Sequence, residues 1–177
     1  MLNKLGDELQ VDKSLRFADL DEMMEQARPD IVAIPVATEL HYSLCKRVLS
    51  YPGVHIEVEK PMCEQLTEAD ELLEIARANR VHTAVHHQGR CSGSLRAVAH
   101  QLARGRVGKL RHLFASDKGY YGGYGLMNIG THLVNNLLEL AGRCRTVSAT
   151  ATVGGRAITP HDVVAAPSGM GFIGKWE

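Results

Sequence analysis

The feature that most constrains the fold is a regular alternation of short apolar runs with amphipathic helical stretches between residues 19 and 87. Three runs rich in strand-forming residues, 31–36, 54–59 and 81–87, are separated by stretches in which apolar residues recur at helical spacing. The first run is continuously apolar, which is typical of a strand buried on both faces. Strands that alternate with helices of this length predict βαβ units, a parallel sheet and right-handed crossovers.

Capping and breaking signals place the helices. Residues 19–22, Asp-Leu-Asp-Glu, have the spacing of a capping box, and Pro29 ends the helix that follows. A second helix is expected over about 40–49, and residues 67–70, Thr-Glu-Ala-Asp, open a third. After Arg90 the pattern changes, and we place a domain boundary there. Beyond it we expect a helix near 95–102, a strand over 110–116, a helix over about 126–141 and a strand over 146–153.

Composition excludes several classes of function. The 177 residues carry 20 basic and 20 acidic side chains, so the net charge of zero gives no long-range attraction to nucleic acid or to an anionic membrane. No apolar run approaches the roughly 20 residues that cross a bilayer, and the N-terminus lacks the apolar core of a secretory signal. The four cysteines form no C-x-x-C pair, and no other metal motif occurs. We therefore expect a cytoplasmic protein without a metal, nucleic-acid or membrane partner.

Polar residues follow the predicted strands at the edge where ligands bind. In an open parallel sheet this edge lies beyond the carboxyl ends of the strands, which places Glu59, Lys60 and His87 along it. Lys60 is held stiffly by the following Pro61, and its ammonium could polarise a hydroxyl or carbonyl oxygen or bind a carboxylate or phosphate. The alternative interpretation is a solvated lysine at a strand end.

A second group of polar residues lies on the helix expected over 126–141. Asn128, His132 and Asn135 follow i, i+4, i+7 spacing and therefore share one face. His132 could line a pocket there and accept a proton. The alternative is a partly buried stripe of amides and imidazole that hydrogen-bonds to the backbone.

Taken together, the two groups resemble the Gfo/Idh/MocA oxidoreductases. The likeness rests on residues 31–38, Glu-Lys-Pro at 59–61, Gln-Gly-Arg at 88–90, the glycine turn at 105–110 and Asn-Ile-Gly-Thr-His-Leu at 128–133. It implies an α/β fold, in which a partial Rossmann-type parallel sheet (βαβαβ, residues 1–90) is followed by the start of an α+β domain with an open sheet (91–177). It also implies hydride transfer between the nicotinamide of NAD or NADP and a hydroxyl-bearing carbon of a sugar, cyclitol or related polyol.

The resemblance also assigns roles to single residues. Lys60 corresponds to the lysine that contacts the substrate hydroxyl and the cofactor ribose, His132 corresponds to the base, and Asn128 stands where relatives commonly have aspartate. The Lys60–Pro61 bond is expected to be cis, and homo-oligomers through the open sheet are common among relatives. Along the cofactor the resemblance places Val36, Thr38, His41, Glu59, Lys60 and Gln88.

One departure from the family pattern concerns the cofactor site. Residues 1–90 lack the G-x-G-x-x-G loop that binds pyrophosphate at a helix N-terminus, and we expect the whole chain to lack it. We therefore expect a chain truncated at both ends, with an incomplete NAD(P) site, weak cofactor binding and no activity on its own. A non-catalytic binding or regulatory protein on the same scaffold, and an inactive truncated gene product, are the alternatives.

Overall fold

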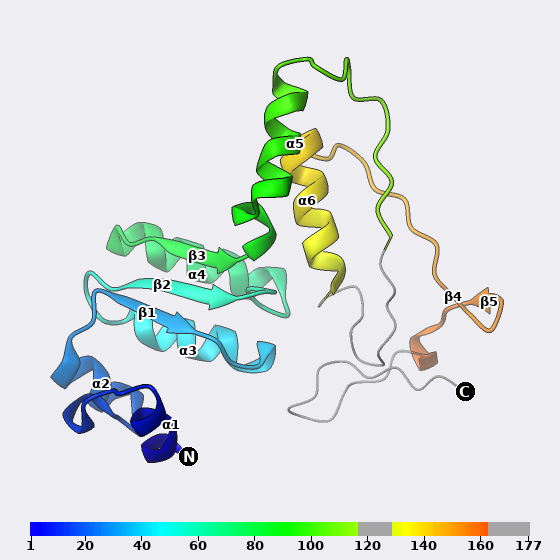
Figure 1. The fold of residues 1–177 in the computed structure, drawn as a ribbon. Helices are drawn as coiled ribbons and strands as arrows, with labels where there is room; N and C mark the ends of the chain where they lie inside the picture. The colour runs from blue at the N-terminus through cyan, green and yellow to red at the C-terminus, as the bar shows by residue number, and fades with distance from the viewer. Residues whose placement is uncertain (117–128, 163–177) are drawn as a thin grey trace.

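The computed structural model describes residues 1–116 and 129–162, and its centre is a three-stranded parallel sheet (Figure 1). The strands lie in the order β1-β2-β3, and Val32 of the first pairs with Ile56 of the second. The parallel sheet and the α/β class predicted from the alternation are therefore confirmed. The strand bounds are β1 (Ile31–Ile34), β2 (His55–Glu59) and β3 (Thr83–His86).

Helices α3 and α4 cover one face of this sheet (Figure 1). The core between sheet and helices includes Leu49 of α3, Ile56 of β2 and Leu72 of α4, each of which is fully buried. Burial of a large aliphatic side chain contributes about 1.5–3 kcal/mol, so this layer is the main source of stability. The helices are α1 (Leu2–Glu8), α2 (Leu20–Ala27), α3 (His41–Leu49), α4 (Leu66–Asn79), α5 (Gly93–Ala103) and α6 (Thr131–Ala141), with 3-10 turns η1 (Lys13–Leu15), η2 (Thr38–Leu40), η3 (Gln88–Cys91) and η5 (Pro160–Asp162).

The opposite face of the sheet is exposed, which corrects one prediction. In β1 only Val32 and Ile34 are buried, whereas Ile31 is 64% exposed and Ala33 also faces solvent. The apolar run 31–36 is therefore not buried on both faces, because no described helix packs on the second face. The strand also ends at Ile34, two residues earlier than expected.

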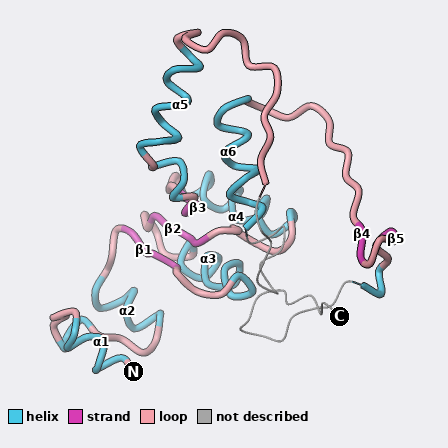
Figure 2. The backbone as a smooth tube through the Cα atoms, turned by 45° about the vertical axis from the view of Figure 1, so that its right-hand side comes forward, coloured by secondary structure: helices cyan, strands magenta, loops and turns pink. Residues whose placement is uncertain are grey.

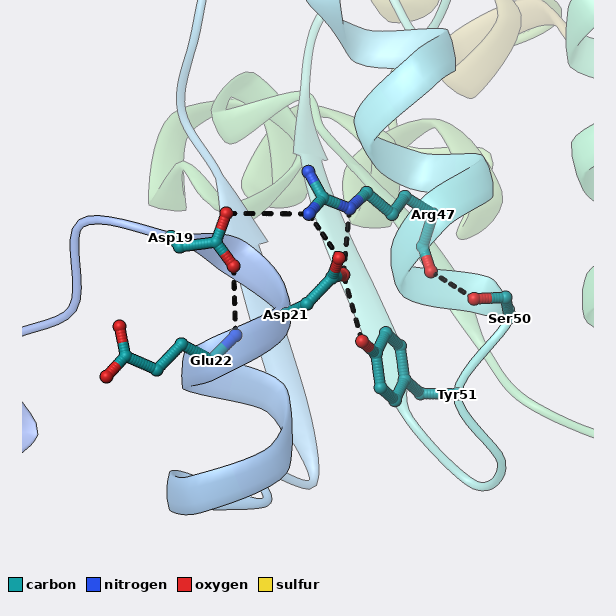
Figure 3. A network of polar contacts seen from close by, with 6 residues as sticks. All are labelled: Asp19, Asp21, Glu22, Arg47, Ser50 and Tyr51. Carbon is teal, nitrogen blue, oxygen red and sulfur yellow. Dashed lines mark hydrogen bonds and ion pairs between the residues drawn. The ribbon is translucent and has the colours of Figure 1, made fainter.

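A charged network joins α2 to α3 (Figure 3). Asp19 is the N-cap of α2, as predicted, and its Oδ1 accepts the backbone N–H of Glu22 at 3.0 Å. The Asp21 carboxylate accepts Nε–H of Arg47 at 2.8 Å and the Tyr51 hydroxyl at 2.9 Å. The hydrogen bond from Arg47 is the main reason why the pKa of Asp21 lies below its ordinary value. This network fixes α2 beside the end of α3.

Two other helix starts test the capping predictions. The helix expected to open at residues 67–70 begins earlier, because Gln65 is its N-cap and the Gln65 N–H donates to the Glu68 carboxylate at 3.2 Å. The helix expected near 95–102 is confirmed as α5, and Ser92 caps it by accepting the N–H of Leu95. Within the described residues, no helix combines the length and the apolar character needed to cross a membrane.

The second half of the chain is organised around α5 and α6, which lie side by side (Figures 1 and 2). The helix predicted over 126–141 is observed from Thr131, and residues 126–128 lie outside the described part. The strand predicted over 110–116 is wrong, because these residues have no regular secondary structure and no described strand pairs with them.

A small hairpin replaces most of the strand expected over 146–153. Only β4 (Thr152–Val153) is extended and paired, with β5 (Arg156–Ala157) antiparallel to it. Gly154 and Gly155 form the two-residue turn with φ of +55° and +76°, a conformation that favours glycine at both positions. The open sheet expected for residues 91–177 is represented, within the described residues, by this hairpin alone.

Candidate functional site

The carboxyl ends of the three parallel strands bring the predicted residues to one edge. Val36 follows β1, Glu59 ends β2 and is followed by Lys60, and His87 follows β3. In Figure 1 the arrowheads of the strands point toward the side of the molecule where α6 lies. The Lys60–Pro61 bond is cis, as the resemblance implied.

The His41 side chain lies between the segments that follow two of these strands, β1 and β2. Its ring is fully buried at the start of α3, with Nδ1 2.8 Å from the carbonyl oxygen of Pro61 and Nε2 3.0 Å from that of Val36. The resemblance placed His41 along the cofactor. A neutral imidazole carries a single N–H and a carbonyl oxygen only accepts, so a neutral ring donates to one of these two carbonyl groups. The ring lies between the turns after β1 and β2.

Glu59 interacts with its neighbours in both directions. Its Oε2 accepts the backbone N–H of Lys60 at 3.2 Å, which fixes the backbone where the lysine emerges. Its Oε1 lies 4.0 Å from Nε2 of His86, whose Nδ1 bonds to Glu57 at 2.7 Å on the exposed face of the sheet. The hydrogen bond to Glu57, followed by the charge of Glu59, raises the pKa of His86.

The rings of His87, which follows β3, and His132 on α6 are in contact. Their ring centroids are 5.8 Å apart and the planes meet at 86°, an edge-to-face contact. Burial is the main cause that lowers the pKa of His87, and the charges of His132, Arg90 and Lys60 add to it. The ring contact places His87 next to His132, and both Lys60 and His87 follow the carboxyl ends of neighbouring strands.

Two further contacts dock α6 on the turn after β3. A Cβ atom at Gly89 would lie 3.2 Å from Oδ1 of Asn136, so α6 packs directly on this glycine. Arg90 forms an ion pair with Glu139 at 3.0 Å. The face of α6 that meets this turn is therefore defined by residues 132, 136 and 139. The sequence analysis missed Asn136 and Glu139, although i, i+4, i+7 spacing from His132 could have found them.

For several of the predicted site residues, the role in the site remains a prediction. Asn128 lies outside the described residues, as does the Gly-Tyr segment 119–125. Thr38 is half-buried and Gln88 is exposed, and both lie at the strand-end edge. Their contact with a cofactor remains a prediction. Asn135 is partly buried, and its Nδ2 has no hydrogen-bond partner among the described residues.

The expectation that the chain has no glycine loop needs a correction. Gly169, Gly171 and Gly174 stand in G-x-G-x-x-G spacing, outside the residues that the structure describes. The spacing alone is a weak signal, because a phosphate site also needs a strand before it and a helix after it. Within residues 1–90 no such spacing occurs.

The described cysteines and acidic groups show no metal centre. In residues 1–116 and 129–162 no group of three His, Cys, Asp or Glu side chains is arranged to hold a metal ion. Burial raises the pKa of Cys45 to about 12 and that of Cys63 to about 11, so both are protonated, unreactive thiols in the core.

Comparison with known proteins supports the resemblance to this family. The sequence profile of the oxidoreductase family with an NAD-binding Rossmann fold, Gfo/Idh/MocA, matches residues 3–87. Residues 3–87 are therefore similar to the NAD-binding part of this family. This confirms the resemblance on which the site residues were assigned, and it agrees with the parallel sheet of the structure.

Relatives of the family match beyond these residues. The uncharacterised oxidoreductase YgjR of Escherichia coli is 26% identical over 84% of this chain and 50% of its own length, and an uncharacterised oxidoreductase of Schizosaccharomyces pombe is 25% identical over 76% and 40%. The chain thus spans about half or less of the length of these relatives.

Solved structures show the same fold. An oxidoreductase from Pseudomonas syringae superposes with a TM-score of 0.67 at 26% identity, covering 79% of this chain and 41% of that one. An inositol dehydrogenase homologue from Azotobacter vinelandii, complexed with NADH and myo-inositol, gives a TM-score of 0.66 at 24% identity with the same coverage.

Proposed function

We propose that the chain provides catalytic residues of an NAD(P)-dependent oxidoreductase that moves hydride between the nicotinamide and a hydroxyl-bearing carbon of a sugar, cyclitol or related polyol. The observation that carries this proposal is the edge-to-face contact of His132 on α6 with His87, beside the strand ends that carry Glu59 and Lys60. The structural likeness to a protein complexed with NADH and myo-inositol supports the cofactor and substrate class.

The residues at the strand ends fit the nicotinamide half of the cofactor. Val36 offers an apolar surface that is 37% exposed, Thr38 a hydroxyl group, and Glu59 and Lys60 charged groups at the same edge. The pyrophosphate half would need a glycine-rich loop, which the described residues do not contain. When bound, the nicotinamide supplies the acceptor for the hydride.

The proposed chemistry divides two tasks between two side chains. The Lys60 ammonium donates a hydrogen bond to the substrate hydroxyl oxygen and stabilises the negative charge that develops as its proton leaves. His132 accepts that proton as the general base. Glu59 and the buried His41 hold the backbone around Lys60, so that the ammonium is presented from a rigid turn.

The proposal is tested by amide mapping on this chain and by turnover in a longer form of the protein that carries a complete cofactor site. In an ¹⁵N spectrum we expect millimolar NADH or NADPH to shift the amides of Val36, Thr38, Glu59 and Lys60. Reduction of NAD(P)⁺ by a panel of polyols is then followed by absorbance for the wild type, Lys60→Ala and His132→Ala. Each substitution should lower turnover by about 10²-fold or more while the cofactor shifts persist.

Two outcomes would count against this assignment. Amide shifts confined to other parts of the chain would remove the cofactor site from the strand ends. Cofactor shifts at the strand ends without turnover of any polyol would favour the alternative, a non-catalytic binding protein on this scaffold. Asp70→Asn, an exposed substitution on α4, is the control that should leave both readouts unchanged.

We also propose the division of the chain near Arg90 into a nucleotide-binding part, 1–90, and a substrate-binding part, 91–177. The separate packing of α5 with α6 supports it. A small-molecule polyol is the proposed ligand, and homo-oligomers through the C-terminal sheet remain a prediction.

A further inference from the structure

His87 is the polar residue of the site that the proposed chemistry leaves without a task. It follows β3, is less exposed than its neighbour His86, and its ring meets that of His132 edge to face. No part of the family resemblance assigns it a role. Its position next to the proposed base therefore needs its own explanation.

The bonding of the His87 ring disfavours a positive charge. Nδ1 is buried, and among the described residues it has no hydrogen-bond partner. An imidazolium carries N–H groups on both ring nitrogens, so protonation would leave a charged donor buried without an acceptor. A neutral ring can place its single proton on Nε2 and avoid this cost.

Most of the charges around His87 also disfavour a positive charge on its ring. His132 on α6, Arg90 on η3 and Lys60 after β2 each disfavour a second positive charge, and Glu59 at the end of β2 opposes them. Burial adds to the three cations and lowers the pKa of His87. Arg90 itself is held in place by Glu139.

We propose that His87 is a positioning residue whose neutral ring holds His132 and makes His132 the one imidazole of the pair that takes a proton. This inference rests on the proposed function, in which His132 receives the hydroxyl proton of the substrate. A single proton enters the pair when the O–H bond breaks, and the pair returns it to water after release of the product. A second proton on His87 would repel the imidazolium that forms on His132.

Proton NMR of the histidine Cε1–H signals tests the pair without substrate or cofactor. In the wild type we expect His132 to take its proton at a higher pH than His87. His132→Phe should raise the titration midpoint of His87, because one of the neighbouring charges is removed. His132→Gln is the second variant, to be used if the aromatic substitution disturbs the fold.

A permanent charge at position 87 provides the reciprocal test. His87→Lys should lower the midpoint of His132 by at least about one pH unit, a tenfold loss of proton affinity. His86→Lys is the matched control, because it places the same charge one residue away on the opposite face of the sheet, and should move His132 by less than about 0.3 unit. His87→Phe keeps a neutral ring and should leave His132 close to its wild-type midpoint.

Three results would overturn the inference. These are a His87 midpoint at or above that of His132, a His87 midpoint that neither His132 variant moves, and equal effects of lysine at positions 86 and 87. The titrations need no turnover, so they can be interpreted even if the protein shows no hydride transfer. Conversely, titrations that contradict the role of His87 would not affect the role proposed for Lys60.

Discussion

His41 shows how one side chain can order a site that it does not face. The ring is fully buried, yet both nitrogens reach backbone carbonyl groups of strand-end turns, at Val36 and at Pro61. Lys60 precedes Pro61, so the position of its ammonium depends on a hydrogen bond made one residue away. A buried ring that donates its N–H to a backbone carbonyl group favours a single local geometry.

Removal of the His41 ring should therefore cost stability and disturb the lysine turn. His41→Leu fills a similar volume but leaves the carbonyl group that accepts the ring N–H without its donor, and we expect it to lower the free energy of unfolding by about 1–3 kcal/mol. Urea denaturation measures this loss. Ser43→Ala on the exposed side of the same helix, which removes a hydrogen bond to the Leu40 carbonyl, should cost less than half as much. Equal losses in the two variants would contradict the role of His41.

The positions of Lys60 and His87 could be predicted from sequence, whereas the partner of His132 could not. Parallel strands share one carboxyl edge, so the residues after β2 and β3 are brought together by topology alone. The face that a helix presents is set by packing. The stripes 128, 132, 135 and 132, 136, 139 have the same i, i+4, i+7 spacing, and the contacts of Asn136 with Gly89 and of Glu139 with Arg90 distinguish them.

At the scale of elements, the docking of α6 depends on the turn after β3. Gly89 supplies the close approach to Asn136, and Arg90 supplies the ion pair to Glu139 at 3.0 Å. An exposed ion pair is worth little by itself, with a typical contribution below about 1 kcal/mol. The close packing at Gly89 therefore contributes more to the position of His132 than the salt bridge does.

A side chain at position 89 should separate α6 from this turn. Gly89→Leu places a Cβ atom 3.2 Å from Asn136 and further atoms beyond it, and we expect a loss of about 1–3 kcal/mol from overpacking. Gly93→Leu is the matched control at the start of α5, where nothing lies within 4 Å of the added Cβ. There the better helix propensity of leucine should leave stability unchanged or raise it by up to about 1 kcal/mol.

Urea denaturation and amide hydrogen exchange measure both glycine variants. Faster exchange in α6 of Gly89→Leu, without a change in α3 or α4, is the expected pattern. The same stability for both variants would show that α6 is held by other contacts.

Strands were predicted less reliably in the second half of the chain than in the first. Residues 54–59 and 110–116 both carry β-type residues, but only the former lie between two partners, β1 and β3. Strand formation depends on cross-strand partners and burial more than on the residue itself. A pattern read from one segment therefore cannot show whether its partner is present.

At the scale of the whole molecule, charged pairs join α3 to α2 and to α4, and a third pair lies within the hairpin segment. Arg47 pairs with Asp21 between α3 and α2, Lys46 pairs with Glu71 between α3 and α4, and Arg156 pairs with Asp162 after the hairpin. In each pair the hydrogen bond from the cation is the main cause that holds the carboxyl pKa below its ordinary value, which is 3.8 for aspartate and 4.5 for glutamate. These carboxylates stabilise the fold above those values, and the contribution is lost as the pH falls through their lower folded pKa.

The two adjacent histidines, His86 and His87, have opposite effects on how the stability of the fold changes with pH around pH 6.5. The pKa of His86 is raised by Glu57, so its contribution is complete below 6.5 and is lost as the pH rises through the higher folded value. The pKa of His87 is lowered by burial, so its contribution is complete above 6.5 and is lost as the pH falls through the lower folded value. The wild type should therefore show a stability maximum near pH 6.5, with a further decline below about pH 4.5 where the paired carboxylates take up protons.

Stability measured by urea denaturation from pH 3 to pH 9 should separate these contributions. His86→Gln removes the histidine contribution that is lost as the pH rises. The stability of this variant relative to the wild type should therefore increase from pH 6 to pH 8. His87→Phe removes the histidine contribution that is lost as the pH falls. The stability of this variant relative to the wild type should therefore increase from pH 7 down to pH 5. Asp21→Asn should leave both histidine effects intact and reduce only the decline below about pH 4.5. If His86→Gln and His87→Phe changed the profile in the same direction, the two rings would not differ in environment, and the neutral state of His87 beside His132 would lose its physical basis.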